Sequence, residues 1–246
     1  MSQIRLRGDR VSLDEPVLVE GFPGVGLVGK IATDHLIDQL EMDYYASVHC
    51  EGLPRVGIYR QGAQHLQPPV RIYASQAQDL LAIQSDIPIA AQAIDAIVGC
   101  LTGWIDDYDA TSLFLSGLPA EREGTPALFG VATGDGAALL EAHDIDVPPE
   151  DGVVSGPTGA LLNRATQSGT DSLGLVVECN PQFPDPEAAS VLLERAIGPV
   201  ADVNVDVSKL IDRATEIQEQ RSAFAERMQE VGEVESTQAQ PLRMYQ

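Results

Sequence analysis

Residues 17–40, VLVEGFPGVGLVGKIATDHLIDQL, decide the fold class. Residues 17–20 form a short apolar segment typical of a buried strand, and residues 21–29 contain four glycines. Residues 31–40 then place apolar side chains at helical spacing. A strand, a glycine-rich loop and a helix in this order predict the opening of a βα unit.

The same alternation continues along the chain to about residue 200. Further strands are predicted at residues 44–49, 56–60, 70–74, 112–116, 127–132 and 172–179. Further helices are predicted at residues 89–102, 136–143, 158–168 and 187–197. Strands that alternate with helices favour an α/β sheet layered between helices, here over residues 1–200.

The pattern changes after residue 200. Apolar side chains recur at steps of three and four, which predicts a long amphipathic helix over residues 201–231. This helix could pack on its own domain or serve oligomerisation, and the sequence leaves both open. Residues 232–243 are polar and nearly free of apolar side chains, so residues 232–246 are predicted to be a flexible tail that ends in an apolar residue and a tyrosine.

The composition is strongly acidic. The 246 residues carry 37 acidic and 15 basic side chains, a net charge of −22, and Lys30 and Lys209 are the only lysines. Such an acidic surface repels the phosphate backbone, which argues against nucleic acid as a partner. Because molar salt screens the self-repulsion of such a surface, we also predict a salt-adapted, halophilic source.

The cysteines and the apolar runs bear on the compartment. Cys50, Cys100 and Cys179 are odd in number and form no local pair, which predicts buried thiols in a reducing compartment and no zinc site. No apolar run approaches the roughly 18 residues of a membrane span. We therefore expect a cytoplasmic protein that is not embedded in a membrane.

The glycine loop invites two nucleotide-binding interpretations. Its candidate residues are Gly21, Phe22, Pro23, Gly24, Gly26, Gly29 and Lys30. Gly24, Gly26 and Gly29 match G-x-G-x-x-G, but Phe22-Pro23 interrupts the turn. Gly29-Lys30 resembles the end of a P-loop, except that Ile31 replaces the hydroxyl that would hold magnesium. A nucleotide or small-molecule enzyme using residues 21–30 is kept as the alternative function.

A family resemblance rests on the same loop. The stretch from Glu20 to Leu36, EGFPGVGLVGKIATDHL, closely resembles the opening motif of the PAC2 family, the proteasome assembly chaperone 2 family and its archaeal relatives. The resemblance continues at residues 130–134, 151–162 and 184–189. It implies a three-layer α/β/α domain with a mostly parallel, nucleoside phosphorylase-like sheet, in which the glycine loop is a structural turn and no cofactor is bound.

The last three residues form the predicted docking element. Met244 can enter an apolar pocket, the ring of Tyr245 can be buried while its hydroxyl is hydrogen-bonded, and the carboxylate of Gln246 can pair with a lysine. This pattern resembles the hydrophobic-tyrosine-any-residue tail that proteasome activators and some archaeal PAC2 proteins insert between α-subunits of the 20S core. The predicted function is proteasome assembly or ATP-independent activation, not enzymatic catalysis, and multivalent docking predicts a homo-oligomer.

Other candidate sites are set aside. The four histidines are scattered and form no catalytic or metal-binding motif. The acidic run at residues 106–109 lacks the remaining ligands of an EF-hand loop and is interpreted as a solvated turn. The segment 155–159 could present backbone N–H groups to an anion, but no base or nucleophile lies near it in the sequence.

Overall fold

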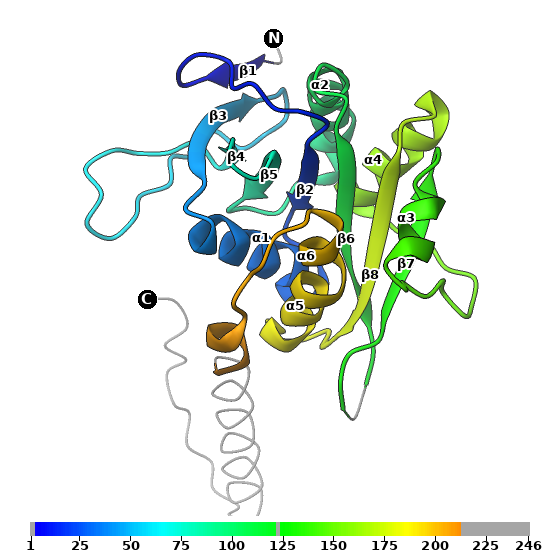
Figure 1. Ribbon diagram of the computed structural model, residues 1–246. Helices are drawn as coiled ribbons and strands as arrows, with labels where there is room; N and C mark the ends of the chain where they lie inside the picture. The colour runs from blue at the N-terminus through cyan, green and yellow to red at the C-terminus, as the bar shows by residue number, and fades with distance from the viewer. Residues whose placement is uncertain (1–2, 122–123, 213–246) are drawn as a thin grey trace, which may run out of the picture.

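The computed structural model describes residues 3–121 and 124–212 (Figure 1). The strands are β1 (Gln3–Leu6), β2 (Val17–Gly21), β3 (Asp43–His49), β4 (Val70–Ser75), β5 (Leu80–Ser85), β6 (Thr111–Pro119), β7 (Leu128–Thr133) and β8 (Ser172–Cys179). The helices are α1 (Val28–Gln39), α2 (Ile94–Asp106), α3 (Ala137–Ala142), α4 (Gly156–Ser168), α5 (Pro186–Leu192) and α6 (Gly198–Val200). Short 3-10 turns, η1 (Val25–Leu27) and η2 (Ala91–Ala93), precede α1 and α2, and a π-helical turn, η3 (Leu193–Ile197), follows α5.

The eight strands form one mixed sheet in the order β1-β3-β4-β5-β2-β6-β8-β7. The pairs β5–β2, β2–β6 and β6–β8 are parallel, and the other four pairs are antiparallel. The prediction of a mostly parallel sheet is therefore wrong. Parallel neighbours need a crossover connection, whereas no helix separates β3 from β4 or β4 from β5, so the chain reverses direction there.

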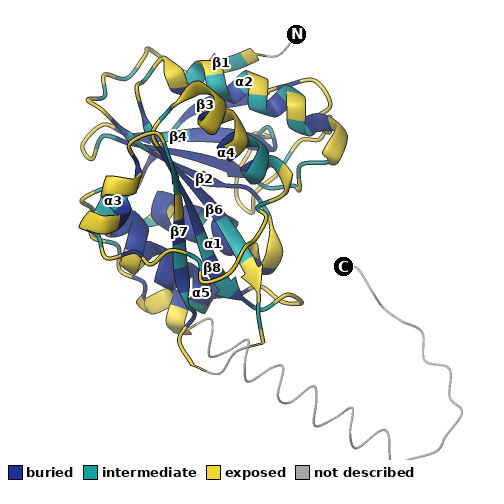
Figure 2. Cartoon of the chain, turned by 90° about the vertical axis from the view of Figure 1, so that its right-hand side faces the viewer, coloured by how far each residue is buried: buried dark blue, intermediate teal, exposed yellow. Residues whose placement is uncertain are grey.

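Helices cover both faces of this sheet. Along β2, Val19 joins a core cluster with residues of α1, α3 and α5, while Leu18 joins a second cluster with residues of α2 and α4. Successive strand side chains point to opposite faces, so the continuous apolar run of β2 is buried on both sides. Figure 2 shows the buried strands between helices whose outer surfaces are exposed.

The predicted strands differ from the observed strands in both directions. The strand predicted at residues 56–60 is absent, and only an isolated antiparallel bridge joins Ile58 to Gln67. Val56 is 47% exposed and Tyr59 is 83% exposed, so this segment has no place in the core. Conversely, the edge strand β1 and the fully buried central strand β5 were not predicted.

The described chain ends on the α1 and α5 side. Residues 208–212 are helical, and the Asp206 side chain accepts a hydrogen bond from the Ser208 backbone N–H at 2.9 Å, as helix-capping residues do. Val207 and Leu210 are buried in the same cluster as α1 and α5. The remainder of the helix predicted to residue 231 lies outside the described residues, as does the predicted tail.

The expected set of reduced thiols is wrong for two of the three cysteines. Cys50, which follows β3, and Cys100 on α2 form a disulfide with a Cα–Cα distance of 6.4 Å. The two residues are 50 positions apart, so local spacing could not reveal the pair. Within residues 3–121 and 124–212, no helix combines the length and the apolar character that crossing a bilayer requires.

Candidate functional site

Of the two predicted sites, the C-terminal tripeptide and the glycine loop, the structure describes only the loop. Met244, Tyr245 and Gln246 lie outside the described residues, so their geometry stays a prediction. The glycine loop is described in full and connects β2 to α1 near the centre of the sheet. The candidate site consists of this loop and the charged side chains around it.

The glycines of the loop lie in tight packing. A Cβ atom on Gly21 would overlap the side chain of Thr33 on α1 and would lie 2.8 Å from the Gly29 carbonyl oxygen. Gly26 has a φ of +62°, which L side chains rarely adopt, and its added Cβ would lie 2.9 Å from Cys179 Sγ. Phe22 is 3% exposed and belongs to the core cluster on the α2 and α4 face.

Backbone contacts join the loop to the segment after β8. The Asp185 N–H donates to the Gly26 carbonyl oxygen at 2.8 Å. The Asp185 carboxylate in turn accepts from the Asn180 N–H at 2.8 Å and from the Ala188 N–H at 3.0 Å, the second contact capping α5. The loop thus lies packed over the carboxyl ends of β6 and β8, the place where open α/β sheets bind ligands.

Lys30 is engaged by protein carboxylates. Its Nζ lies 2.8 Å from Asp34 Oδ2, one helical turn away, and 3.4 Å from Asp86 Oδ1. A P-loop lysine instead extends to the phosphates of a nucleotide. Together with Ile31 at the position of the magnesium ligand, this pairing argues against a phosphate-binding role for Lys30.

Asp86, whose side chain is 9% exposed, is the centre of an ionic network directly after β5. Arg71 Nη1 lies 2.7 Å from its Oδ2, and Arg60 Nη2 lies 2.7 Å from its Oδ1. The Gln84 amide donates to Oδ1 at 2.9 Å. Burial favours the neutral acid, but the hydrogen bond and charge of Arg71, with help from Gln84 and Lys30, outweigh it and lower the pKa of Asp86.

Glu20 is the buried carboxylic acid of the site and was not among the predicted site residues. It is fully buried at the carboxyl end of β2, where Oε1 accepts from the Phe22 N–H at 2.7 Å and Oε2 accepts from the Thr158 hydroxyl at 3.0 Å. Burial raises the pKa of Glu20 to about 7, although these hydrogen bonds lower it. An acidic residue inside an otherwise apolar strand was the signal that could have identified it.

Two of the remaining sequence candidates contact residues that are distant in sequence. Thr158, within the segment 155–159, contacts Glu20 and so ties the start of α4 to the glycine loop. The Asp107 carbonyl oxygen accepts from Arg10 at 2.7 Å. Over the described ranges, no group of three or more His, Cys, Asp and Glu side chains is placed to hold a metal ion.

Comparison with known proteins adds the family. The model of the PAC2 family matches residues 18–225. An uncharacterized protein of Methanocaldococcus jannaschii is 30% identical over 220 residues, which cover 88% of this chain and 88% of that relative. The match to the family model extends beyond residue 200 into the predicted C-terminal helix.

Solved structures show the same fold. Pyrococcus furiosus PbaA, an archaeal homolog of a proteasome-assembly chaperone, matches with a TM-score of 0.80 and 26% identity over 93% of this chain and 94% of PbaA. Pyrococcus furiosus PbaB, an archaeal proteasome activator, matches with a TM-score of 0.79 and 21% identity over 91% of this chain and 98% of PbaB. The likeness to PbaB concerns the fold alone.

Proposed function

Because this chain belongs to the PAC2 family, we propose that it is a cytoplasmic proteasome-binding protein that docks on the α-subunits of the 20S core through Met244, Tyr245 and Gln246. It assists assembly of the α-ring or opens its gate without ATP. It acts as a homo-oligomer and as a binding protein, with no cofactor and no catalytic step.

The observation that carries this proposal is the match to PbaA, a homolog of a proteasome-assembly chaperone, over almost the whole of both chains. The fold shared with PbaB, a proteasome activator, is consistent with either outcome of docking. The tail supplies the contact itself, since an apolar residue, a tyrosine and a terminal carboxylate suit a groove between subunits that contains a lysine.

The packing of the glycine loop supports a structural role for it. Gly21 and Gly26 permit contacts with Thr33 and Cys179 that a side chain would prevent. Lys30 is paired with two carboxylates. We therefore assign the loop to positioning α1 over the sheet, and no observation favours the alternative nucleotide-binding function.

A binding assay on immobilised 20S core tests the docking residues individually. We expect Tyr245→Ala to weaken binding at least tenfold, because it removes both the buried ring and the hydroxyl. Gln238→Ala, a change of similar kind within the same tail, is the matched control and should leave binding unchanged. Equal binding by all three proteins would contradict docking through the tail.

Activity assays then separate the two modes of action. A gate-opening activator would raise hydrolysis of a fluorogenic peptide by preassembled 20S core, and Tyr245→Ala would abolish the increase. An assembly chaperone would leave that rate unchanged and would accelerate the formation of 20S particles from purified subunits. We expect the second pattern, in line with the match to PbaA.

A further inference from the structure

The disulfide between Cys50 and Cys100 joins two elements that are far apart in the sequence. Cys50 follows β3 and begins the connection to β4, residues 51–69, whereas Cys100 lies in the middle of α2. In the proposed function the protein is cytoplasmic, and disulfides in a reducing compartment are as a rule transient bonds with a catalytic or redox role. A permanent structural crosslink is therefore not expected here.

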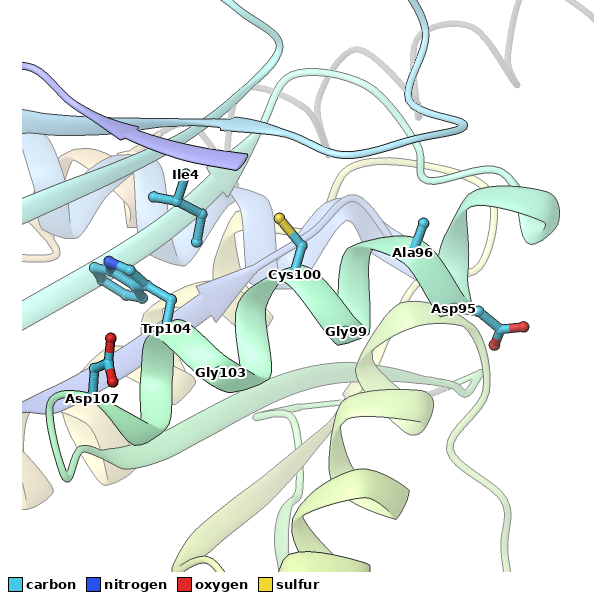
Figure 3. A pocket seen from close by; sticks show the side chains of 8 residues that line it. All are labelled: Ile4, Asp95, Ala96, Gly99, Cys100, Gly103, Trp104 and Asp107. Atoms are coloured by element: carbon cyan, nitrogen blue, oxygen red, sulfur yellow. The ribbon is translucent and has the colours of Figure 1, made fainter. Parts of the chain in front are cut away.

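The two cysteines differ in their access to solvent. Cys50 is 8% exposed and belongs to the core cluster on the α2 and α4 face. Cys100 is partly exposed and lines a hollow of about 580 Å³ along α2, which we call the α2 hollow. In Figure 3 the sulfur of Cys100 points to the side of the helix on which Ile4 lies. A small molecule in solution therefore reaches the Cys100 sulfur more easily than the Cys50 sulfur.

Small residues leave the helix surface beside Cys100 open. Ala96 and Gly103 line the same hollow, four residues before and three residues after Cys100, so both are its neighbours on the surface of α2. Gly99 also lines the hollow. A Cβ atom added to Gly99 or Gly103 would have no heavy atom within 4 Å. The α2 hollow thus provides a path from solvent to Cys100.

The disulfide fixes the first part of the β3–β4 connection. Residues 51–57 form no helix or strand. The Leu53 N–H donates to the Cys50 carbonyl oxygen at 3.3 Å, and Gly52 lies against η2, where an added Cβ would be 3.1 Å from Ala93 Cα. These contacts are weak or local, so the covalent bond from Cys50 to α2 is the strongest restraint on this stretch.

The second part of the connection has restraints of its own. Ile58 and Gln67 exchange two backbone hydrogen bonds of 2.8 Å. Arg60 Nη2 lies 2.7 Å from Asp86 Oδ1. Neither interaction involves the disulfide. Opening the disulfide is therefore expected to loosen residues 51–57 and to leave the part from Ile58 onward in place.

We propose that the Cys50–Cys100 disulfide is a thiol–disulfide exchange site, which a small monothiol opens by attacking Cys100 from the α2 hollow, and that opening releases residues 51–57. The attacking thiolate forms a bond to Cys100 Sγ while the bond to Cys50 Sγ breaks, and Cys50 leaves as a thiolate that takes up a proton. A second thiol molecule then attacks the mixed disulfide and displaces Cys100. Two thiol molecules are thereby oxidised to their disulfide, and both cysteines are reduced.

Treatment of the native full chain with 2-mercaptoethanol tests the exchange. Samples are quenched in acid, denatured and alkylated, and mass spectrometry identifies the alkylated cysteines. Before treatment we expect alkylation of Cys179 alone, and after treatment alkylation of all three cysteines in protein that is still folded. A disulfide that is absent even after incubation with 2-hydroxyethyl disulfide, or that opens only in denaturant, would overturn the proposal.

Two substitutions at one position test the route through the α2 hollow. A leucine on a helix lies over the turn that precedes it, so Gly103→Leu should cover Cys100 and slow the opening about tenfold. Gly103→Ala is the matched control, because it stabilises the helix at least as much but leaves the path open. It should open at the rate of the wild type. Equal slowing in both variants would show that opening follows unfolding, and no slowing in either would exclude this route.

Single cysteine variants test which sulfur is attacked. Cys100 that remains in Cys50→Ser should form a mixed disulfide with 2-hydroxyethyl disulfide about tenfold faster than Cys50 that remains in Cys100→Ser, because buried cysteines react slowly. Equal rates, or faster reaction of Cys50, would contradict attack at Cys100.

Hydrogen exchange measures the released segment. Reduction should speed exchange of the amides of residues 51–57 and leave those of β8 unchanged. The double variant Cys50→Ser with Cys100→Ser should show the fast exchange without thiol, and thiol should not alter it. Unchanged exchange at residues 51–57 on reduction would overturn the release. The exchange site uses the cytoplasmic location of the proposed function but not docking, so failure of the protein to bind 20S core would leave these results standing.

Discussion

Two buried carboxyl groups at the carboxyl ends of neighbouring parallel strands behave in opposite ways. Glu20 on β2 is fully buried, the Asp86 side chain after β5 is 9% exposed, and β2 pairs directly with β5. Glu20 accepts hydrogen bonds and forms no ion pair with the residues that the structure describes, and burial raises its pKa to about 7. Asp86 is also penalised by burial, but Arg71, with Gln84 and Lys30, lowers its pKa.

The difference shows that two acids on neighbouring strands hold different segments of the chain by different interactions, Glu20 by hydrogen bonds and Asp86 by ion pairs. At neutral pH, Glu20 titrates, because its pKa is about 7, and it joins the glycine loop to α4 through hydrogen bonds. Asp86 stays charged and holds Arg60, in the connection between β3 and β4, and Arg71, on β4. Counter-charge, not burial alone, decides which form a buried acid adopts.

The largest expected effect comes from removing the counter-charge of Asp86. Arg71→Met should lower the free energy of unfolding by about 3 to 5 kcal/mol, because it removes the fully buried partner of Asp86 and leaves only the more exposed cations Arg60 and Lys30. Urea denaturation at pH 7 measures the change. Arg71→Met combined with Asp86→Asn is the control and should recover part of the loss. A loss below about 1 kcal/mol for the single variant would contradict the role assigned to this pair.

The second effect is the pH dependence caused by Glu20. Its folded pKa of about 7 lies above the ordinary value of 4.5, so the folded state holds the proton more tightly and its stability falls as pH rises from about 4.5 to 7. At about 1.4 kcal/mol per pH unit, the loss is about 3 kcal/mol. Urea denaturation from pH 4 to 8 should show this loss in the wild type and not in Glu20→Gln. Parallel pH profiles for the two proteins would contradict the assignment.

The smallest effect concerns Lys30, the outer partner of Asp86. Its partner Asp34 is 42% exposed, so Lys30→Met should cost less than about 1 kcal/mol. The Lys30→Met variant also tests the alternative function, nucleotide binding by the glycine loop.

A panel of adenine and nicotinamide nucleotides should leave the unfolding temperature of the wild type unchanged. Stabilisation of about 2.7 kcal/mol at a hundredfold excess over Kd, lost in Lys30→Met, would instead favour nucleotide binding.

The sequence predicted the local elements better than it predicted their pairing. Residues 17–40 gave the β2, loop and α1 unit, because apolar spacing and glycines act locally. The antiparallel half of the sheet was missed, because strand direction depends on connections that carry no periodic signal. β5 was not predicted because its apolar run is only four residues long and ends at the polar Gln84 and Ser85.

The candidate site likewise has a part that the sequence predicts and a part that it does not. The glycine loop could be located from its motif, whereas its contacts with Thr33, Cys179 and Asp185 come from parts of the chain distant in sequence. The Asp86 network and the Cys50–Cys100 disulfide likewise join residues that share no local pattern. The docking tripeptide lies beyond the described residues and still rests on the sequence and the family.

Docking through residues 244–246 is the central claim, and co-sedimentation with purified 20S core in molar potassium chloride tests it most directly. Full-length protein should sediment with the core particle, and a variant lacking residues 244–246 should stay in the supernatant while keeping the same unfolding temperature. Equal sedimentation of both proteins, or failure of the full-length protein to sediment with the core, would contradict the claim.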